Sequence, residues 1–172
     1  TGEWCTFQAG KLVPEKKTGV QLANRTKPTN LDRVIILDSG STIKATFKTA
    51  SMVGNVKEAT IPLEMNTNGG KVLVKKTGVV PRFGQVWFDP NMMANILGLF
   101  HMTKAYRCTM DTAVENCINV HTPGGVTKFK ATPEGLYCWE PTKAYQQEIK
   151  QLKKVGVCNL VYGTASGGSK EG

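Results

Sequence analysis

The stretch of sequence that decides the fold is Val34-Ile35-Ile36-Leu37-Asp38-Ser39-Gly40-Ser41-Thr42. Four apolar residues, three of them β-branched, run directly into an acid, a hydroxyl and a glycine. Such a run predicts a buried strand, and Gly40 allows the backbone to turn sharply after it. Asp38 is therefore expected at the end of a rigid strand, with its carboxyl group free for chemistry.

Hydrolysis by Asp38 would need a second acid, because a lone carboxylate at neutral pH can act only as a base. Two carboxyl groups a few ångströms apart share one proton, so that one activates water and the other protonates or polarises the carbonyl under attack. No other Asp in the chain follows an apolar run and precedes a hydroxyl and a glycine. The partner acid would have to come from a second copy of the chain. The alternative is a common turn, in which Asp38 and Ser39 bond to nearby backbone N–H groups.

A second motif, Asn95-Ile96-Leu97-Gly98, lies further along the chain. Together, the Asp-Ser-Gly-Ser turn and this hydrophobic-hydrophobic-Gly sequence resemble the retropepsins, the dimeric aspartic proteases of retroviruses and LTR retrotransposons. Residues 86–99, V-W-F-D-P-N-M-M-A-N-I-L-G-L, are similar in spacing to the V-L-Y-V-P-x-L-x-x-N-L-L-S-L segment of copia-type retrotransposon polyproteins. Gly135-Leu136-Tyr137-Cys138-Trp139 looks like the G-x-L-Y element of the pre-integrase region in those polyproteins. The similarity covers residues 31–139.

The resemblance implies a mainly β, retropepsin-like closed antiparallel fold for residues 31–112, which would be one half of a homodimeric aspartic protease. A two-fold axis would bring the two copies of Asp38 together. The implied function is endopeptidic cleavage of the chain's own Gag-Pol polyprotein, without metal or organic cofactor, in cytoplasmic retrotransposon particles.

The resemblance also assigns roles around Asp38. Ser39 would hydrogen-bond across the dimer, Gly40 would donate backbone N–H bonds to the carboxylate, and Ser41 would lie beside its outer oxygen. Retroviral enzymes usually follow the glycine with Ala and Asp, whereas this chain has Ser41 and Thr42. Retroviral enzymes use that Asp to contact the substrate backbone, and Thr42 takes its place in this chain.

A polar, glycine-bearing tip, Asn66-Thr67-Asn68-Gly69-Gly70, separates two predicted strands, Ala59–Met65 and Val72–Val74. This pattern predicts a hairpin. In retropepsins the corresponding place is occupied by the flap, a mobile hairpin that closes over the bound peptide, so the resemblance assigns substrate binding to Gly69 and Gly70. A plain surface turn is the alternative, and Thr77-Gly78 is a second candidate for the tip.

The resemblance implies that the hydrophobic-hydrophobic-Gly motif, Ile96, Leu97 and Gly98, packs beneath the Asp38 turn as the second half of a wide loop. Asp89-Pro90 before it fits the start of a short helix or a tight loop. The apolar residues of this region are predicted to be core: Met92, Met93, Ile96, Leu97 and Leu99.

Both ends of the chain lie outside the expected protease. Residues 1–30, with Trp4 and Phe7 as an aromatic anchor pair, are predicted to form a leader or linker with at most short strands. Residues 113–162 are predicted to form an appended pre-integrase-like piece of β structure with one helix. Residues 163–172 are predicted to form a flexible Gly/Ser tail. Four strands are predicted from position 106 on: Tyr106–Met110, Cys117–His121, Val126–Lys130 and Leu136–Trp139. Ahead of the tail, a helix over 142–156 is indicated by a Thr142 cap, an apolar stripe of Tyr145, Ile149 and Leu152, and Gly156 at its end.

Composition and charge limit the alternatives. The chain of 172 residues is 40% hydrophobic and 20% charged, as in ordinary globular proteins. No apolar run is long enough to span a membrane and no signal peptide is evident, so an intracellular protein is expected. The formal charge of +9 is spread along the chain, and nucleic-acid binding is not expected as the main function.

Five cysteines without a C-x-x-C pair argue against a disulfide framework. Cys117 and His121 stand four apart, but His101 is the only other histidine, so no zinc site is expected. The main competing hypothesis is a non-catalytic β-rich interaction module of a retroelement polyprotein, in which Asp38 only stabilises a turn.

Overall fold

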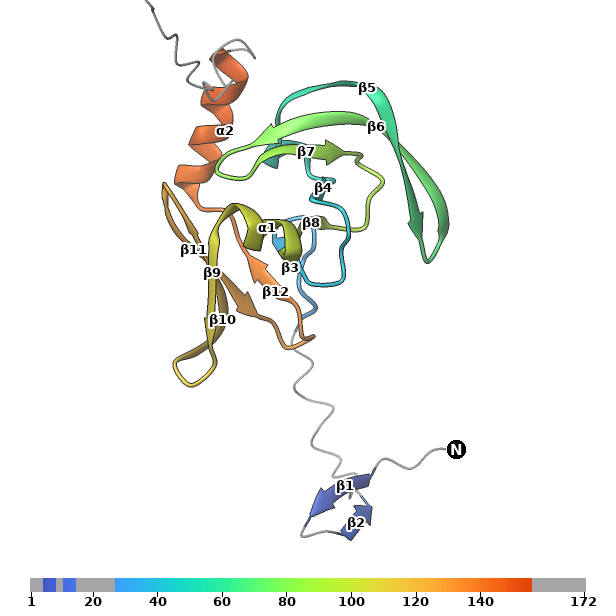
Figure 1. The fold of residues 1–172 in the computed structure, drawn as a ribbon, viewed down its shortest axis with the longest axis vertical. Coiled ribbons are helices and arrows are strands. Elements are labelled where there is room, and N and C mark those ends of the chain that lie inside the picture. The colour runs from blue at the N-terminus through green and yellow to red at the C-terminus, as the bar shows by residue number, and fades with distance from the viewer. Residues whose placement is uncertain (1–4, 9–10, 15–26, 156–172) are drawn as a thin grey trace, which may run out of the picture.

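The computed structural model describes residues 5–8, 11–14 and 27–155, and these ranges are mainly β (Figure 1). Strands β1 (Cys5–Gln8) and β2 (Lys11–Pro14) pair with each other as an antiparallel hairpin. The short strands expected in this part of the chain are therefore present. Trp4, Gly156 and the predicted tail 163–172 lie outside the described residues.

Residues 35–139 contribute ten strands to a single sheet, in the order β5-β6-β7-β4-β8-β3-β12-β11-β10-β9. The bounds of these strands are β3 (Ile35–Asp38), β4 (Ala45–Phe47), β5 (Gly54–Thr67), β6 (Gly70–Val80), β7 (Gly84–Phe88), β8 (Asn95–Gly98), β9 (Arg107–Asp111), β10 (Glu115–Thr122), β11 (Gly125–Ala131) and β12 (Tyr137–Trp139). The strands predicted between positions 106 and 139 are confirmed, with bounds shifted by one or two residues.

The sheet is mixed, where a closed antiparallel fold was expected. Strand β3 is parallel to β8, and β4 is parallel to β7. Parallel neighbours need a long crossover, and residues 39–94 supply it between β3 and β8. Within the described residues the strand order has two ends, β5 and β9, so the expected closure is not seen.

In the part of the chain that the structure describes, two α-helices and one 3₁₀ helix accompany the sheet. Helix α2 (Lys143–Val155) is the predicted one, with the Tyr145 N–H donating to the Thr142 hydroxyl at 3.3 Å and Tyr145 and Ile149 buried. Helix α1 (Leu99–Ala105) was not predicted, because it is a single short segment with only Met102 buried. The 3₁₀ helix η1 spans Ala50–Met52. No helix in the described ranges combines the length and the apolar character needed to cross a membrane.

One hydrophobic core extends across the predicted protease boundary at residue 112. Ile35, Phe47 and Leu97 from the first part belong to the same buried cluster as Phe129 and Tyr145 from the second. Strand β12 pairs with β3 itself, Cys138 opposite Ile36 and Trp139 opposite Ile35. Residues 113–155 therefore complete the sheet that carries Asp38.

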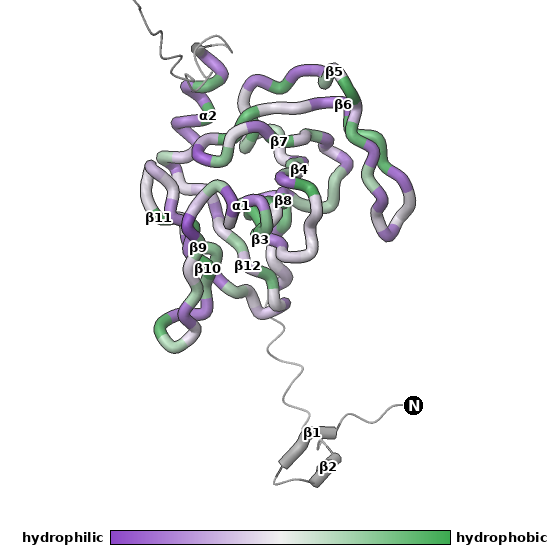
Figure 2. The backbone as a smooth tube through the Cα atoms, in the orientation of Figure 1, coloured by the Kyte–Doolittle hydropathy of each residue, from purple (hydrophilic) through white to green (hydrophobic). Residues whose placement is uncertain are grey.

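The β5–β6 hairpin extends from the body as a long curved arm (Figure 1). Its turn joins Thr67 to Gly70, so the predicted tip is confirmed, and Figure 2 shows this tip as hydrophilic. The second candidate tip was wrong, because Thr77-Gly78 lies inside β6. Position 78 has no room for a side chain, because a Cβ there would overlap the Val53 side chain.

The region before β8 is a tight loop. The Asn91 N–H donates to Asp89 Oδ1 at 2.9 Å, and the Met92 N–H donates to the Asp89 carbonyl at 3.1 Å. Leu97 is buried as predicted, but Met93 is 85% exposed, so its assignment to the core was wrong. Met93 lies on the outside of this loop, where the strand periodicity that guides such predictions does not apply.

Candidate active site

The two motifs singled out in the sequence are neighbours in the sheet. Strand β3 ends at Asp38, and the parallel register of β3 and β8 places Asp38 opposite Gly98. Leu37 and Leu97, one residue earlier on each strand, are both buried. Asp38 is partly exposed at the end of this rigid pair, so its carboxyl group stands at the surface of a packed support.

The turn after Asp38 is held by local hydrogen bonds. The Gly40 N–H donates to Asp38 Oδ1 at 2.8 Å, as predicted for that glycine. The Ser41 hydroxyl donates to the Ile43 carbonyl at 3.0 Å. Ser41 thus stabilises the turn backbone, where a position beside the outer oxygen of Asp38 was expected. Ser39 is exposed.

Steric crowding explains why position 98 is a glycine. A Cβ at this position would lie 2.6 Å from the Ile43 carbonyl oxygen and 3.3 Å from the Ser41 carbonyl oxygen. The Gly98 N–H donates to the Lys44 carbonyl at 2.9 Å. The end of β8 therefore packs directly against the backbone of the Asp38 turn, and only glycine fits there. Ile96 and Leu97 precede it in the same strand, Leu97 fully buried and Ile96 partly.

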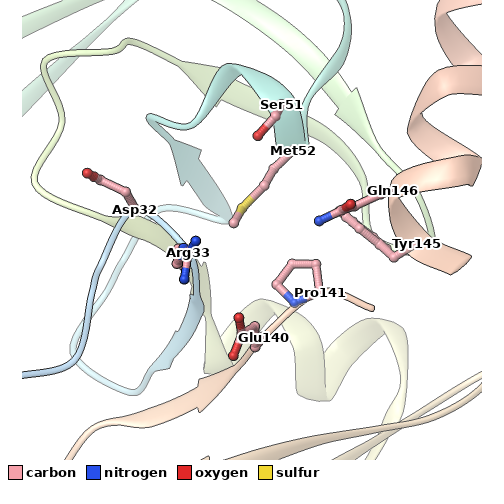
Figure 3. Close-up of a pocket in the computed structure, with 8 residues that line it drawn as sticks. All are labelled: Asp32, Arg33, Ser51, Met52, Glu140, Pro141, Tyr145 and Gln146. Carbon is pink, nitrogen blue, oxygen red and sulfur yellow. The ribbon is translucent and has the colours of Figure 1, made fainter. Parts of the chain in front are cut away.

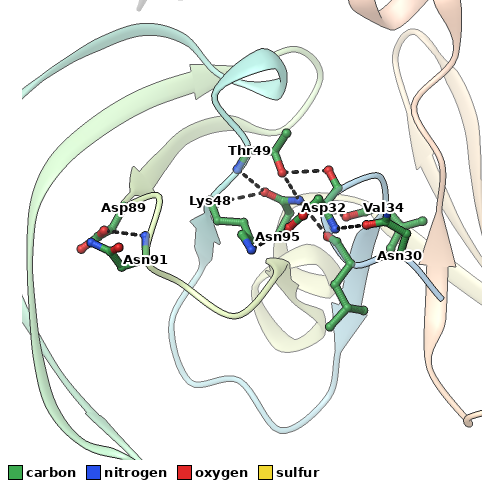
Figure 4. Close-up of polar contacts among 9 residues, drawn as sticks. Asn30, Asp32, Val34, Lys48, Thr49, Asp89, Asn91 and Asn95 are labelled. Carbon is green, nitrogen blue, oxygen red and sulfur yellow. Dashed lines mark hydrogen bonds and ion pairs between the residues drawn. The ribbon is translucent and has the colours of Figure 1, made fainter. Parts of the chain in front are cut away.

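Asn95, for which no role was predicted, connects three segments at the end of β3 opposite to Asp38 (Figure 4). Its Oδ1 accepts the backbone N–H groups of Lys48 and Thr49, both at 2.9 Å. Its Nδ2 donates to the Leu31 and Val34 carbonyls and to the Thr49 hydroxyl, at 3.3, 3.2 and 3.0 Å. The side chain is fully buried. The sequence contains one signal for this role, since Asn95 is a polar amide directly before the apolar residues Ile96 and Leu97.

Gly69 and Gly70 lie at the tip of the β5–β6 arm. Thr67 Oγ1 accepts the Gly69 N–H at 3.2 Å and donates to the Gly70 carbonyl at 2.8 Å. Gly70 has φ of +111°, a conformation that favours glycine. Within the described chain, no hydrogen bond or ion pair joins this tip to the Asp38 turn, so the structure does not bring these two predicted parts of the site together.

A cavity of about 310 Å³ lies at the other end of β3, away from Asp38 (Figure 3). It is formed between the residues before β3, the helix η1, and the segment leading from β12 into α2. Its lining residues are Asp32, Arg33, Ser51, Met52, Glu140, Pro141, Tyr145 and Gln146. The cavity is therefore not the cleft of an Asp38-centred site.

Two cysteine thiols, those of Cys108 and Cys138, lie in surroundings that disfavour their reactive form. Burial raises the pKa of Cys108, and burial followed by the charge of Glu134 raises the pKa of Cys138, which disfavours the nucleophilic thiolate. His121 Nε2 lies 2.8 Å from the Thr109 hydroxyl. Among the described residues no group of three or more His, Cys, Asp or Glu side chains is close enough to hold a metal ion.

Comparisons with protein families, with curated proteins and with solved structures give no match. The interpretation of the site therefore depends on its residues and their geometry.

Proposed function

We propose that this chain is the retropepsin-like aspartic endopeptidase of a copia-type LTR retrotransposon polyprotein, active as a homodimer. The single observation that carries the proposal is the pairing of Asp38 with Gly98 at the ends of two parallel strands. Two motifs that are far apart in the sequence meet there, and both are among the segments that carry the resemblance.

The proposed chemistry needs a second Asp38 from a sister chain. Brought close, the two carboxyl groups would share one proton. The ionised carboxyl takes a proton from water as the water oxygen attacks the peptide carbonyl, and the protonated one donates to the carbonyl oxygen. The tetrahedral intermediate then collapses, the C–N bond breaks, and a proton passes to the leaving amine.

Several features support a role for Asp38 beyond packing. Its carboxyl group is partly exposed at the end of β3, whereas the strand behind it is buried. The Gly40 N–H bond fixes one carboxylate oxygen, and the Gly98 contact fixes the backbone of the turn. Fixed orientation is what acid–base chemistry at a two-fold axis requires.

The competing function is a non-catalytic β-rich interaction module. The same Gly40 N–H bond favours it, because an aspartate that accepts the N–H two residues ahead is also an ordinary turn former. Asp89 makes the equivalent bond to Asn91 at the end of β7. The two functions therefore differ in whether Asp38 does chemistry, and not in the local geometry.

The test is processing of a longer precursor that contains this chain, with and without the aspartic-protease inhibitor pepstatin. Asp38→Asn is expected to lower the rate by roughly 10³-fold or more while the fold is kept. Asp89→Asn is the matched control, because it changes an acid with the same turn bond, and it should process at the wild-type rate. Processing that survives Asp38→Asn would show that the acid is misassigned.

A further inference from the structure

We infer that His101 is a positioning residue for the Asp38 turn, an inference that rests on the proposed function. His101 lies in α1, which begins directly after Gly98. Its Nε2 is 2.9 Å from the carbonyl oxygen of Thr42, within the turn that leads from Asp38 to β4. The helix that follows the hydrophobic-hydrophobic-Gly motif thus reaches back to the aspartate-bearing turn.

The chemistry of this contact fixes the state of the imidazole. A carbonyl oxygen can only accept, so His101 must carry a proton on Nε2 and donate it. The neutral ring then has its remaining lone pair on Nδ1. This tautomer follows from the partner and can be measured directly.

The imidazole lies beside Gly98 and one aromatic ring. His101 Cδ2 would be 3.3 Å from a Cβ built on Gly98, so the glycine leaves room for the imidazole. The Phe100 ring packs edge-on against the imidazole, with centroids 5.5 Å apart and an interplanar angle of 81°. Lys104 Nζ lies 4.4 Å from the Phe100 ring centre. The imidazole is therefore oriented by packing as well as by its hydrogen bond.

The His101 bond completes the restraints on the turn. His101 holds the Thr42 carbonyl, and the Ser41 hydroxyl and the Gly98 N–H hold the next two carbonyls, those of Ile43 and Lys44. Without His101 the Thr42 carbonyl would turn to solvent and the backbone beside Asp38 would sample more positions. Misplacement of a catalytic group by a fraction of an ångström lowers kcat more than it weakens binding.

The kinetic experiment compares His101→Leu with His101→Gln in the full chain. The substrate is a fluorogenic peptide that contains the bond cleaved in the precursor. His101→Leu should lower kcat about tenfold, equivalent to about 1.4 kcal/mol, and change KM by less than about twofold. His101→Gln, whose amide N–H can donate to the same carbonyl, should recover at least about half of the wild-type kcat. Equal kcat for His101→Leu and wild type, or no recovery by His101→Gln, would overturn the inference.

A second measurement does not depend on proteolysis. Long-range ¹⁵N–¹H spectra of the full chain should show the neutral His101 ring protonated on Nε2. A ring protonated on Nδ1 would overturn the inference even if His101→Leu did not fold. If Asp38→Asn processes like wild type, the proposed function fails, whereas an Nε2-protonated ring would still support the contact between His101 and the turn.

Discussion

Asn95 shows at the residue scale how one side chain fixes the start of β3, the strand that ends at Asp38. Its amide makes five hydrogen bonds, four of them to the backbone, and none of its surface is exposed. The bonds join the segment before β3 to the end of β4 through the first residue of β8. A buried polar group of this kind is stabilising only while every partner is present.

Replacing Asn95 by leucine should be strongly destabilising. The change keeps the volume similar but leaves the Lys48 and Thr49 N–H groups without their acceptor, and each such buried group costs about 1–3 kcal/mol. We expect the free energy of unfolding to fall by at least about 3 kcal/mol, measured by urea denaturation.

Asn91→Leu is the control for this prediction, because Asn91 is exposed and only its backbone N–H bonds to Asp89. Its free energy of unfolding should change by less than about 0.5 kcal/mol. A loss below about 1 kcal/mol for Asn95→Leu would contradict the role given to the amide.

Glu134 connects elements that flank the Asp38 strand. It lies between β11 and β12, and its carboxylate accepts the Thr29 N–H at 2.8 Å and the Thr29 hydroxyl at 3.0 Å, just ahead of β3. The Thr29 backbone N–H, then Glu134's own, and the hydroxyls of Thr132 and Thr29 lower the pKa of Glu134 to about 2. The ionised form therefore holds the entry to β3 against the loop before β12.

This pKa predicts an acid-dependent contribution to stability. Because the folded-state pKa lies below the ordinary value of 4.5, the contribution is fully present above pH 4.5 and is lost as the pH falls to about 2. Wild type should be more stable than Glu134→Gln at pH 6, and the difference should shrink to near zero at pH 2. The measurement is the urea midpoint of unfolding of both proteins between pH 2 and pH 6. A difference in midpoint that does not change with pH would contradict the role given to the Glu134 carboxylate.

Arg82 joins the base of the hairpin arm to the C-terminal elements. It lies between β6 and β7 with φ of +70°, unusual for a residue with a side chain. Its guanidinium is 3.4 Å from Glu148 of α2 and 5.8 Å from the centre of the Trp139 ring, and its carbonyl accepts the Tyr106 hydroxyl. These contacts hold Arg82 in its unusual backbone conformation, and the bond to Glu148 links α2 to the base of the arm.

Residues 27–155 pack as one unit, whereas β1 and β2 form a separate two-stranded sheet. Phe129, Tyr145 and Ile149 belong to the core of Ile35 and Phe47, and β12 supplies one of the two neighbours of β3. The predicted division into a protease domain of residues 31–112 and an appended segment of residues 113–162 stays a prediction. The packing, in contrast, makes residues 113–155 part of the fold that supports Asp38.

Truncation tests this view of the molecule. A chain of residues 27–112 would expose the apolar side chains that now contact Phe129, Tyr145 and Ile149, and it would leave one edge of β3 unpaired. We expect no cooperative thermal unfolding for 27–112 by circular dichroism, whereas 27–155 should unfold cooperatively. A cooperative transition in the shorter chain would mean that the first part folds independently.

Local patterns in the sequence were sufficient for much of the fold. The β-branched run before Asp38, the polar tip at Asn66–Gly70 and the capped stripe of Tyr145 and Ile149 predicted a strand, a hairpin and a helix that are present. These features depend on neighbours a few residues away, so a single sequence contains the information. Helix α1 and the exposed Met93 were missed because neither has a periodic pattern.

The sequence by itself predicted the strand that ends at Asp38, the hairpin of β5 and β6, and the strands from β9 to β12. It did not predict β7, and it placed Ile96, Leu97 and Gly98 in a wide loop where the structure has strand β8. Only the tertiary structure decided that β3 lies parallel to β8 and that β12 pairs with the other edge of β3. The physical reason is that strand pairing and buried amide bonds such as those of Asn95 are made between residues far apart in the chain. Their partners are chosen when the whole core packs, and no local pattern encodes that choice.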